Sequence, residues 1–405
     1  MSKKIFCLLI DFKYLDHFLH TQECLMEKIS KNYERFYLIN SSQIENKINS
    51  IYFNWDKFSN AKFEEKQINK SIFKNFILLN PSNIEELDEF FRNKEVLIIN
   101  QIERSFSYFK LWFYLNKKNI SNIIISNSAV QETSEQVATT LNLKIKSFIA
   151  KKLPKKIFTL LSIVNIFPNI KLRFEANKNF YNFFSKKTLR NKFIKPIYEK
   201  IISINHRTYD MNIINKLDVS EKYIVFIEAD LNHKEDVARR GYLGDEIINN
   251  HYKKMREHLN HLSQIFQKEV VVCVHPKYDL ELVQSKFKDF KVLKYRTREF
   301  IYKSFLVVFL ESSSIIDAFF LKKNIIQIKP SFDWTAGIDY VSKFGITNLD
   351  IQKQEERFIE KNKLKKMLED KEIGYENFIN SYIKHKDDDE PGVDKVIRVL
   401  KENFF

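Results

Sequence analysis

Apolar and polar positions form alternating blocks along the chain, and these blocks predict alternating strands and helices. In the first half, short apolar runs predict strands, and apolar residues spaced three or four apart predict the helices between them. The predicted strands are 5–12, 34–40, 95–101 and 122–128, and the predicted helices are 16–31 and 106–118. This alternation predicts a mostly parallel sheet with helices on both faces.

A second regular series begins near residue 222. Its predicted strands are 222–230, 269–275, 290–295, 305–311 and 324–329, and its predicted helices are 246–267, 279–287, 297–304 and 313–323. We interpret this series as a five-strand doubly wound unit, complete in itself. The chain is therefore predicted to be an α/β protein of two Rossmann-like doubly wound domains facing a cleft, at 1–210 and 211–405.

Composition narrows the class of protein. The 405 residues, 44% hydrophobic, can form two domains with cores of their own. The chain has six glycines and no Gly-rich phosphate loop, so an anion must be held by side chains or ordinary turns. The three cysteines lack paired spacing, and Cys7 and Cys273 lie in apolar runs, so we expect buried thiols in a reducing, cytoplasmic compartment. The apolar run near the start is too short for a signal peptide or an anchor.

The formal charge of +15 is unevenly distributed. Residues 151–200 hold thirteen Lys and Arg but only two acids, and 155–167 is predicted to be a helix with a broad apolar face. A basic amphipathic stretch is typical of an anionic membrane surface or of a solvated face. Interleaved aromatic residues keep nucleic-acid binding as a remote alternative. We expect no nucleic-acid partner and a peripheral position on the inner face of the cytoplasmic membrane.

Polar groups follow three predicted strands of the second half. They are Glu228 and Asp230, then His275-Pro276-Lys277, then Glu311-Ser312-Ser313-Ser314. Each group has a structural alternative: solvated turn residues, a strand end marked by Pro, and a serine helix cap. Because carboxyl ends of parallel strands share one edge, together they predict a carboxylate, an imidazole and a phosphate-sized anion site in one place.

These segments resemble a known group of proteins. Bacterial sialyltransferases, Kdo transferases and related surface-carbohydrate biosynthesis proteins of the GT-B fold carry an acidic residue, an HP motif and a serine motif in this order. Here the matching segments are FIEADLNHKED (226–236), VVVCVHP (270–276), RTREF (296–300) and FLESSSIIDAFFLKKNIIQI (309–328). The first half gives no motif match.

The resemblance implies an inverting glycosyltransferase that moves an acidic sugar, Kdo or a nonulosonic (sialic-type) acid, from a CMP-activated donor to a glycan or lipid-linked glycan acceptor. It implies that Glu228 or Asp230 is the general base and that His275 meets the departing phosphate. The implied nucleotide-binding residues are His275, Pro276, Lys277, Thr297, Glu311, Ser312, Ser313 and Ser314. The family has Asp where this chain has Glu228, and a carboxylate misplaced by about 1 Å can cost about 100-fold in rate. If neither acid is the base, Asp11 and Glu103 in the first half are the next candidates.

Other functions stay open at this stage. A CDP-polyol phosphotransferase and a nucleotide-sugar epimerase share the fold. No metal or cofactor is expected, because no Cys/His cluster has ligand spacing, and the DDDE run at 387–390 is interpreted as a solvated loop.

Overall fold

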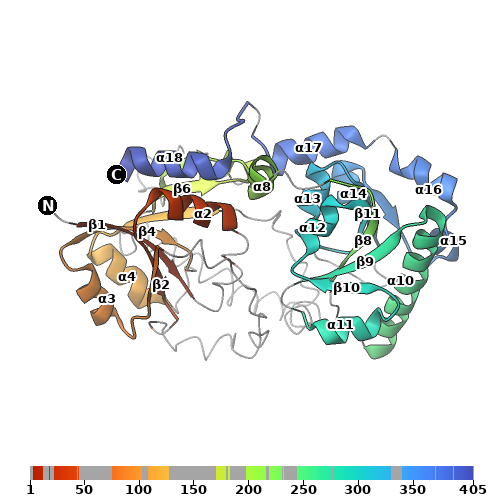
Figure 1. Ribbon diagram of the computed structural model, residues 1–405, viewed down its shortest axis with the longest axis horizontal. Helices are drawn as coiled ribbons and strands as arrows, with labels where there is room; N and C mark the ends of the chain where they lie inside the picture. The colour runs from red at the N-terminus through yellow and green to blue at the C-terminus, as the bar shows by residue number, and fades with distance from the viewer. Residues whose placement is uncertain are drawn as a thin grey trace, which may run out of the picture.

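The chain folds into two α/β halves, each built on a parallel sheet (Figure 1). The structure is a computed structural model, and it describes residues 3–11, 18, 22–42, 44, 75–102, 108–126, 170–178, 181–182, 198–215, 219–229, 231, 244–275, 278–329, 340–369, 371–385 and 387–404. No helix within these ranges is both long and apolar enough to cross a membrane.

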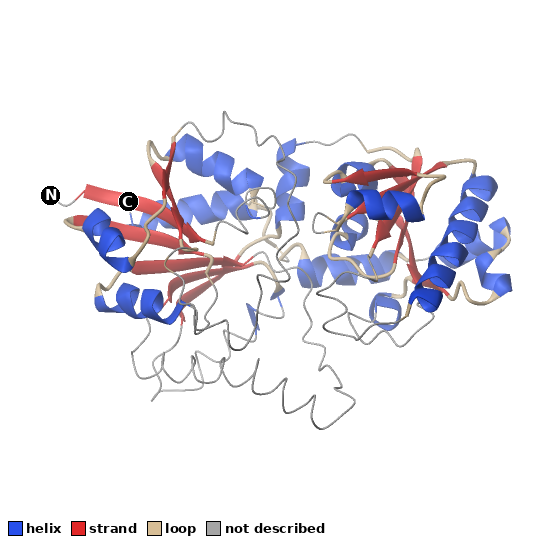
Figure 2. Cartoon of the chain, turned by 90° about the horizontal axis from the view of Figure 1, so that it is seen from below, coloured by secondary structure: helices blue, strands red, loops and turns tan. Residues whose placement is uncertain are grey.

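The first sheet has seven strands in the order β3-β2-β1-β4-β5-β6-β7, all parallel. They are β1 (Lys3–Ile10), β2 (Phe36–Asn40), β3 (Phe76–Leu79), β4 (Lys94–Asn100), β5 (Ser121–Ser126), β6 (Ile170–Glu175) and β7 (Tyr198–Ser203). One face packs on α2 (Glu23–Asn32), the other on α3 (Ile84–Phe91) and α4 (Phe109–Lys117). Figure 2 shows these strands pointing from the N-terminal end of the molecule towards the second half.

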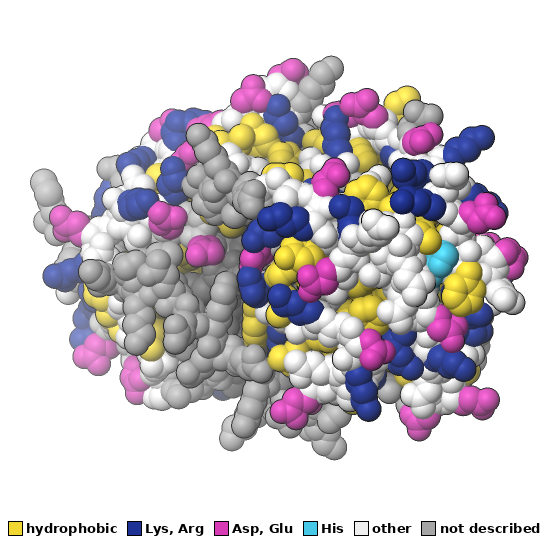
Figure 3. Space-filling view, turned by 45° about the vertical axis from the view of Figure 1, so that its right-hand side comes forward, with side chains coloured by type: hydrophobic (Ala, Val, Ile, Leu, Met, Phe, Trp, Pro, Cys, Tyr) yellow, Lys and Arg dark blue, Asp and Glu magenta, His cyan; other side chains and the backbone are white. Residues whose placement is uncertain are grey.

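The second sheet has six parallel strands in the order β10-β9-β8-β11-β12-β13. They are β8 (Tyr223–Glu228), β9 (Glu269–Val274), β10 (Lys291–Lys294), β11 (Ser304–Phe309), β12 (Asn324–Ile328) and β13 (Thr347–Leu349). The helices around it are α10 (Asp245–Phe266), α11 (Leu280–Lys286), α12 (Thr297–Tyr302), α13 (Ile315–Phe320), α14 (Tyr340–Phe344), α15 (Gln354–Arg357), α16 (Lys361–Leu368) and α17 (Glu372–Tyr382). Basic and acidic side chains intermingle on its surface (Figure 3).

Alternating side chains place an apolar layer on each face of the second sheet. Ile224 and Phe226 of β8 pack with the apolar face of α10, which includes Tyr252, Met255 and Leu259 at helical spacing. Val225 of β8 and its neighbours pack with α12, α13, α14 and α17 on the opposite face. Burial on both faces explains why the strands are continuous apolar runs.

The predicted fold class is confirmed: the chain is an α/β protein with two doubly wound parallel sheets. One prediction about the second sheet is wrong, because β13 adds a sixth strand beyond β12. The strand β6 within the basic segment 151–200 and the strand β7 at its end were not predicted either, and Phe174 of β6 is fully buried. The predicted helix at 155–167 lies outside the described residues.

The last helix, α18 (Gly392–Phe404), crosses back to the first sheet. Its apolar face, which includes Val396 and Leu400, joins the core layer of α2. A partly exposed salt bridge of 2.7 Å joins Lys28 of α2 to Asp394, and Figure 1 shows α18 lying along the first half. A division of the chain at residue 210 stays a prediction, with α18 as a second-half segment that packs on the first sheet.

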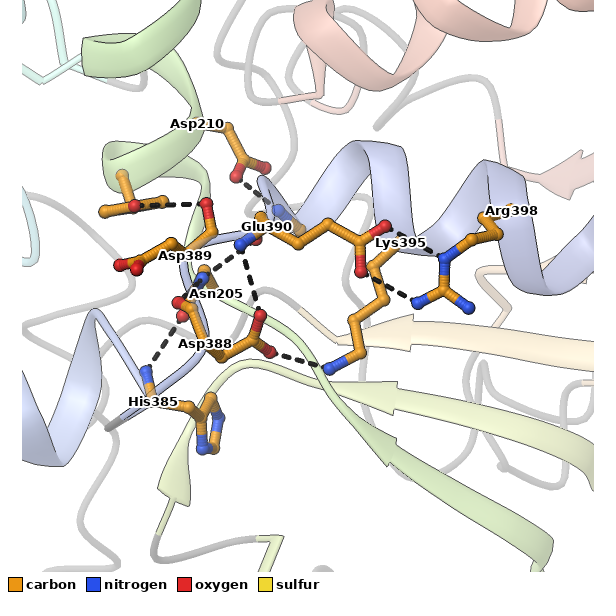
Figure 4. A network of polar contacts seen from close by, with 10 residues as sticks. Asn205, Asp210, His385, Asp388, Asp389, Glu390, Lys395 and Arg398 are labelled. Atoms are coloured by element: carbon orange, nitrogen blue, oxygen red, sulfur yellow. Dashed lines mark hydrogen bonds and ion pairs between the residues drawn. The ribbon is translucent and has the colours of Figure 1, made fainter.

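Two chain crossings lie side by side between the halves, and we call residues 204–215, His385 and 387–393 the joint (Figure 4). The Asn205 amide nitrogen donates to the carbonyl oxygens of Asp388 (2.7 Å) and Glu390 (2.9 Å), and its oxygen accepts from the His385 backbone N–H (2.8 Å). Helix α8 (Arg207–Asn215) continues the first crossing. The DDDE run is a loop whose residues Asp387 and Asp389 are exposed, as expected, and its backbone is also hydrogen-bonded into the joint.

The two crossings approach each other closely at Gly392. A Cβ atom at this position would lie 2.3 Å from the backbone oxygen of Asn205, far inside van der Waals contact. We expect Gly392→Ala to lower the free energy of unfolding by about 1–3 kcal/mol, the usual cost of overpacking. Chemical denaturation measures it. Glu402→Ala, at an exposed i,i+4 ion pair on the same helix, should change it by less than about 0.5 kcal/mol, and equal effects of the two variants would contradict the close approach.

Candidate active site at the strand ends

Three adjacent strands end at one edge of the second sheet. In the register of the sheet, Glu228 of β8 lies beside Val274 of β9, and Ile227 lies beside Phe309 of β11. His275 follows β9 directly and Glu311 lies two residues beyond β11. The three predicted polar strand ends therefore share one edge.

Glu228 is held in the core layer of α10. Glu228 is only 2% exposed, and its Oε1 accepts a 2.8 Å hydrogen bond from the Tyr252 hydroxyl. The same hydroxyl accepts from the Leu231 backbone N–H at 3.4 Å, and the Lys286 ammonium lies 4.4 Å above the Tyr252 ring. The Glu228 carboxylate thus anchors the turn that leaves β8. Its role as a base stays a prediction, and Asp230 lies outside the described residues.

His275 follows β9 directly, where the chain leaves the sheet towards α11. It is half-buried, and its carbonyl oxygen accepts from the Tyr278 backbone N–H at 3.0 Å. The two rings lie 5.4 Å apart. Asp279 ends the turn by accepting from the Leu282 backbone N–H at 3.2 Å as the cap of α11. Pro276 and Lys277 lie outside the described residues.

The serine turn leads from β11 into α13. Glu311, Ser312 and Ser314 are half-buried and Ser313 is exposed. The Ser312 hydroxyl oxygen accepts from the Ser314 backbone N–H at 3.1 Å, so this side chain shapes the turn. Ser314 occupies the cap position of α13 without a side-chain cap bond. Ser313 is the exposed serine of this turn.

Thr297 opens α12 at the same edge and hydrogen-bonds the thiol of Cys273 in β9. Burial raises the pKa of Cys273 to about 12, so this cysteine is a neutral core thiol. The free thiol of Cys7 is buried too, as predicted. Thr297 therefore ties α12 to β9, and its contact with a nucleotide stays a prediction.

The first sheet offers one further candidate acid at its own carboxyl edge. Asp11 follows β1, and its two oxygens accept from the hydroxyls of Ser42 (2.7 Å) and Tyr108 (3.0 Å). Glu103 lies outside the described residues. Among the residues the structure describes, no three His, Cys, Asp or Glu side chains are placed to hold a metal ion.

Sequence reasoning missed Tyr252, the partner of Glu228, and the polar residues of the joint. Tyr252 occupies an apolar-face position of α10, where an aromatic residue is indistinguishable from ordinary core. The acids of the DDDE run were visible, but the contacts with Asn205 and Tyr209, nearly two hundred residues away, are made by the backbone carbonyl oxygens of the run.

Comparison with known proteins finds the same fold in other solved structures. No protein-family model and no curated protein matches the sequence. Among solved structures, the chain is similar to the UDP-GlcNAc 2-epimerase of Methanocaldococcus jannaschii (TM-score 0.52, 11% identity, 99% of this chain and 100% of that chain). It is also similar to the wall teichoic acid polymerase TagF (TM-score 0.52, 12% identity, 100% of this chain and 90% of that chain). A third similar structure is that of S. aureus MnaA, solved with UDP (TM-score 0.50, 11% identity, 99% of this chain and 96% of that chain). At these identities the likeness shows the shared two-domain fold.

Proposed function

We propose that the chain is an enzyme that uses a nucleotide-activated sugar, and that it transfers an acidic sugar of the Kdo or sialic type from a CMP donor to a surface glycan acceptor. The observation that supports this most is the single sheet edge shared by Glu228, His275 and the serine turn. Ligands of open parallel sheets bind at this edge. Similar folds in an enzyme acting on UDP-GlcNAc and in a protein solved with UDP support the nucleotide-sugar class.

In this proposal each strand end has one task. His275 donates a proton to the oxygen of the departing phosphate, a task that suits an imidazole because its ordinary pKa lies near neutrality. The Ser313 hydroxyl donates a hydrogen bond to the same phosphate. The buried state of Glu228 favours Asp230 as the base, with Glu228 and Tyr252 holding the turn that carries it.

A second candidate function is transfer of a polyol phosphate from a CDP donor. The similarity to the wall teichoic acid polymerase TagF over the whole chain favours it among the alternatives. The serine turn and His275 can serve either donor, because both reactions release a nucleotide phosphate.

The experiment is a thermal-shift panel with CMP, CDP, UDP and their sugar conjugates. A ligand that binds only the folded chain stabilises it by about 2.7 kcal/mol at a hundred times its dissociation constant. We expect CMP compounds to raise the melting temperature most. A shift with CDP-glycerol alone would select the polyol transferase, and no shift with any nucleotide would contradict the whole proposal.

The acceptor is proposed to be glycan on a lipid carrier, reached through the basic segment 151–200. Each Lys or Arg near an anionic surface contributes about 1 kcal/mol to binding. We expect the protein to sediment with vesicles rich in anionic lipid and to be released by about 0.5 M salt. Changing Lys151, Lys152, Lys155 and Lys156 to Glu should abolish sedimentation and preserve activity on a soluble acceptor. Equal sedimentation of both proteins would refute the membrane role.

A further inference from the structure

Three elements of the second half meet at the side chain of Tyr252. This residue lies on the buried face of α10 and is 3% exposed. Its ring packs edge-on against Phe287, just beyond α11, with 5.5 Å between the ring centroids. Phe287 in turn lies 5.6 Å from Phe226 of β8. The packing of the ring places the Tyr252 hydroxyl at the carboxyl end of β8, beside Glu228.

The hydroxyl of Tyr252 has three polar neighbours. Glu228 Oε1 lies 2.8 Å away, and the Leu231 backbone nitrogen and the Lys286 ammonium each lie 3.4 Å away. A backbone N–H and an ammonium group can only donate, so the hydroxyl donates its own proton to Glu228. The result is a chain of hydrogen bonds from a cation through a phenol to a carboxylate, and hydrogen bonds to charged groups are stronger than neutral ones.

Two of these neighbours flank Asp230 in the sequence. Glu228 is the last residue of β8 and precedes Asp230 by two positions, and Leu231 follows it directly. Glu228 and Leu231 are both 2% exposed. One buried hydroxyl therefore holds the chain on both sides of the proposed base.

Lys286 connects the same hydroxyl to the segment that begins at His275. It is the last residue of α11, the helix capped by Asp279 four residues after His275. The Lys286 ammonium lies 4.4 Å from the centroid of the Tyr252 ring, and its carbonyl oxygen accepts from Arg256 Nη1 of α10 at 2.7 Å. Helix α10 is thus bonded to the end of α11 through Arg256 and to the end of β8 through Tyr252.

We propose that Tyr252 and Lys286 are positioning residues that hold the end of β8, and with it the proposed base Asp230, in a fixed place relative to His275. This inference rests on the proposed function. An acid and a base that serve one reaction must keep their separation, because a displacement of about 1 Å can cost about 100-fold in rate. Both residues act through Glu228 and Leu231, so they should govern turnover and leave nucleotide affinity unchanged.

The first test compares Tyr252→Phe with Tyr375→Phe. Tyr375 is the matched control, because it is 5% exposed and its hydroxyl donates to the Lys323 carbonyl oxygen at 2.7 Å, on the opposite face of the sheet. Turnover is measured as release of CMP from CMP-sialic acid or CDP-glycerol, and calorimetry measures the affinity for CMP.

Tyr252→Phe should lower turnover per folded molecule by about 10- to 100-fold and leave the affinity for CMP unchanged. Tyr375→Phe should lower only the melting temperature. Equal turnover of wild type and Tyr252→Phe, or an equal loss of turnover in the two variants, overturns the proposal.

A change at Lys286 tests the same link at a half-buried position, where folding is not at stake. Lys286→Met keeps the aliphatic chain over the ring and removes the charge, so turnover should fall by about 3- to 10-fold. Lys288→Met, at an exposed lysine two residues further on, is the control and should match wild type. In an Asp230→Asn background Tyr252→Phe should cost nothing more, because both changes act on one base. Unchanged turnover in Lys286→Met, or a full further loss in the double variant, contradicts the positioning role.

Hydrogen exchange separates failure of this proposal from failure of the proposed function. The Leu231 amide should exchange about 10-fold faster in Tyr252→Phe than in Tyr375→Phe, whether or not the protein binds a nucleotide. If wild type binds and releases CMP but Leu231 exchanges equally in both variants, the positioning role is refuted and the function stands. If wild type binds no nucleotide and Leu231 exchanges faster only in Tyr252→Phe, the function is refuted and the link between β8 and α10 stands. If neither effect is found, both proposals are refuted.

Discussion

Replacing His275 by Ala is expected to lower turnover by about 100-fold or more while the protein stays folded, because a positioned general acid contributes about 10²- to 10⁴-fold to rate. The structure explains why folding should persist. His275 is half-buried, and the turn is held by backbone and Asp279 contacts that do not need the imidazole. Steady-state kinetics with the donor found in the thermal-shift panel measures the loss.

His261 provides the matched control. It is also a half-buried histidine, but its Nε2 bonds the Ile359 carbonyl oxygen at 2.7 Å and ties α10 to the segment before α16. His261→Ala should lower the melting temperature and leave turnover per folded molecule unchanged. A His275→Ala variant with near-normal turnover, or one that unfolds, would show that this histidine only marks the end of β9.

The strands that the sequence predicted best are those that are buried on both faces of the sheet. The central strands β8, β9 and β11 are buried on both faces, and their apolar runs predicted their positions within about two residues. A short, β-branched apolar run bounded by turn residues is typical of a strand buried on both faces. Because all are parallel, the shared edge of their polar ends followed from the pattern as well.

The strands that were not predicted contain charged residues, and the hydrophobic pattern assigns such segments to loops. In β6, Arg173 alternates with buried residues and is compensated by Glu175, with 2.6 Å between Arg173 Nη2 and Glu175 Oε2. Such a pair is visible only once the strand exists. The last strand, β13, has three residues and too few apolar positions to stand out.

The polar residues of the joint depend on partners that no local pattern connects. Thr208 meets Asp317 across 109 positions, and Asn205 meets Glu390 across 185. Each residue alone reads as an ordinary surface or cap residue. The packing of α8 on α13 brings Thr208 to Asp317, and the segment that leads into α18 brings Glu390 to Asn205, so these contacts are products of topology.

The pH dependence of stability should be dominated at the joint by Asp210. This residue of α8 is buried, with Oδ1 accepting from the Gly392 backbone N–H (2.5 Å) and Oδ2 from that of Val393 (3.1 Å). Burial raises the pKa of Asp210 to about 7. The two backbone hydrogen bonds and the charge of Lys28 lower this pKa, and the charge of Asp394 raises it.

The sign of the effect follows from proton binding. Between pH 4 and pH 7 the folded chain keeps the Asp210 proton, whereas the unfolded chain has released it. Stability therefore falls as pH rises through this window, by about 1.4 kcal/mol per pH unit and about 4 kcal/mol in total as an order of magnitude. Above pH 7 the carboxyl is ionised in both states and no further loss follows. The buried His206, with its lowered pKa, changes stability in the opposite direction as pH falls below about 6.5.

The variant Asp210→Asn isolates this contribution. Its amide keeps one acceptor for the backbone of α18 and cannot ionise, so the free energy of unfolding should fall less from pH 4 to pH 7 than in wild type. The two proteins should be similar near pH 4, and the variant should be the more stable near pH 8. Denaturant unfolding at several pH values measures the free energy of unfolding of both proteins. In the difference between the two curves, the contributions of His206 and of all other titratable groups cancel.

Asp389→Asn is the control, because Asp389 is 83% exposed and, among the described residues, its side chain pairs only with Lys384. Parallel curves for Asp210→Asn and wild type from pH 4 to pH 8 would show that folding does not raise the pKa of the Asp210 carboxyl, and that an ionised carboxylate ties the two crossings in this range.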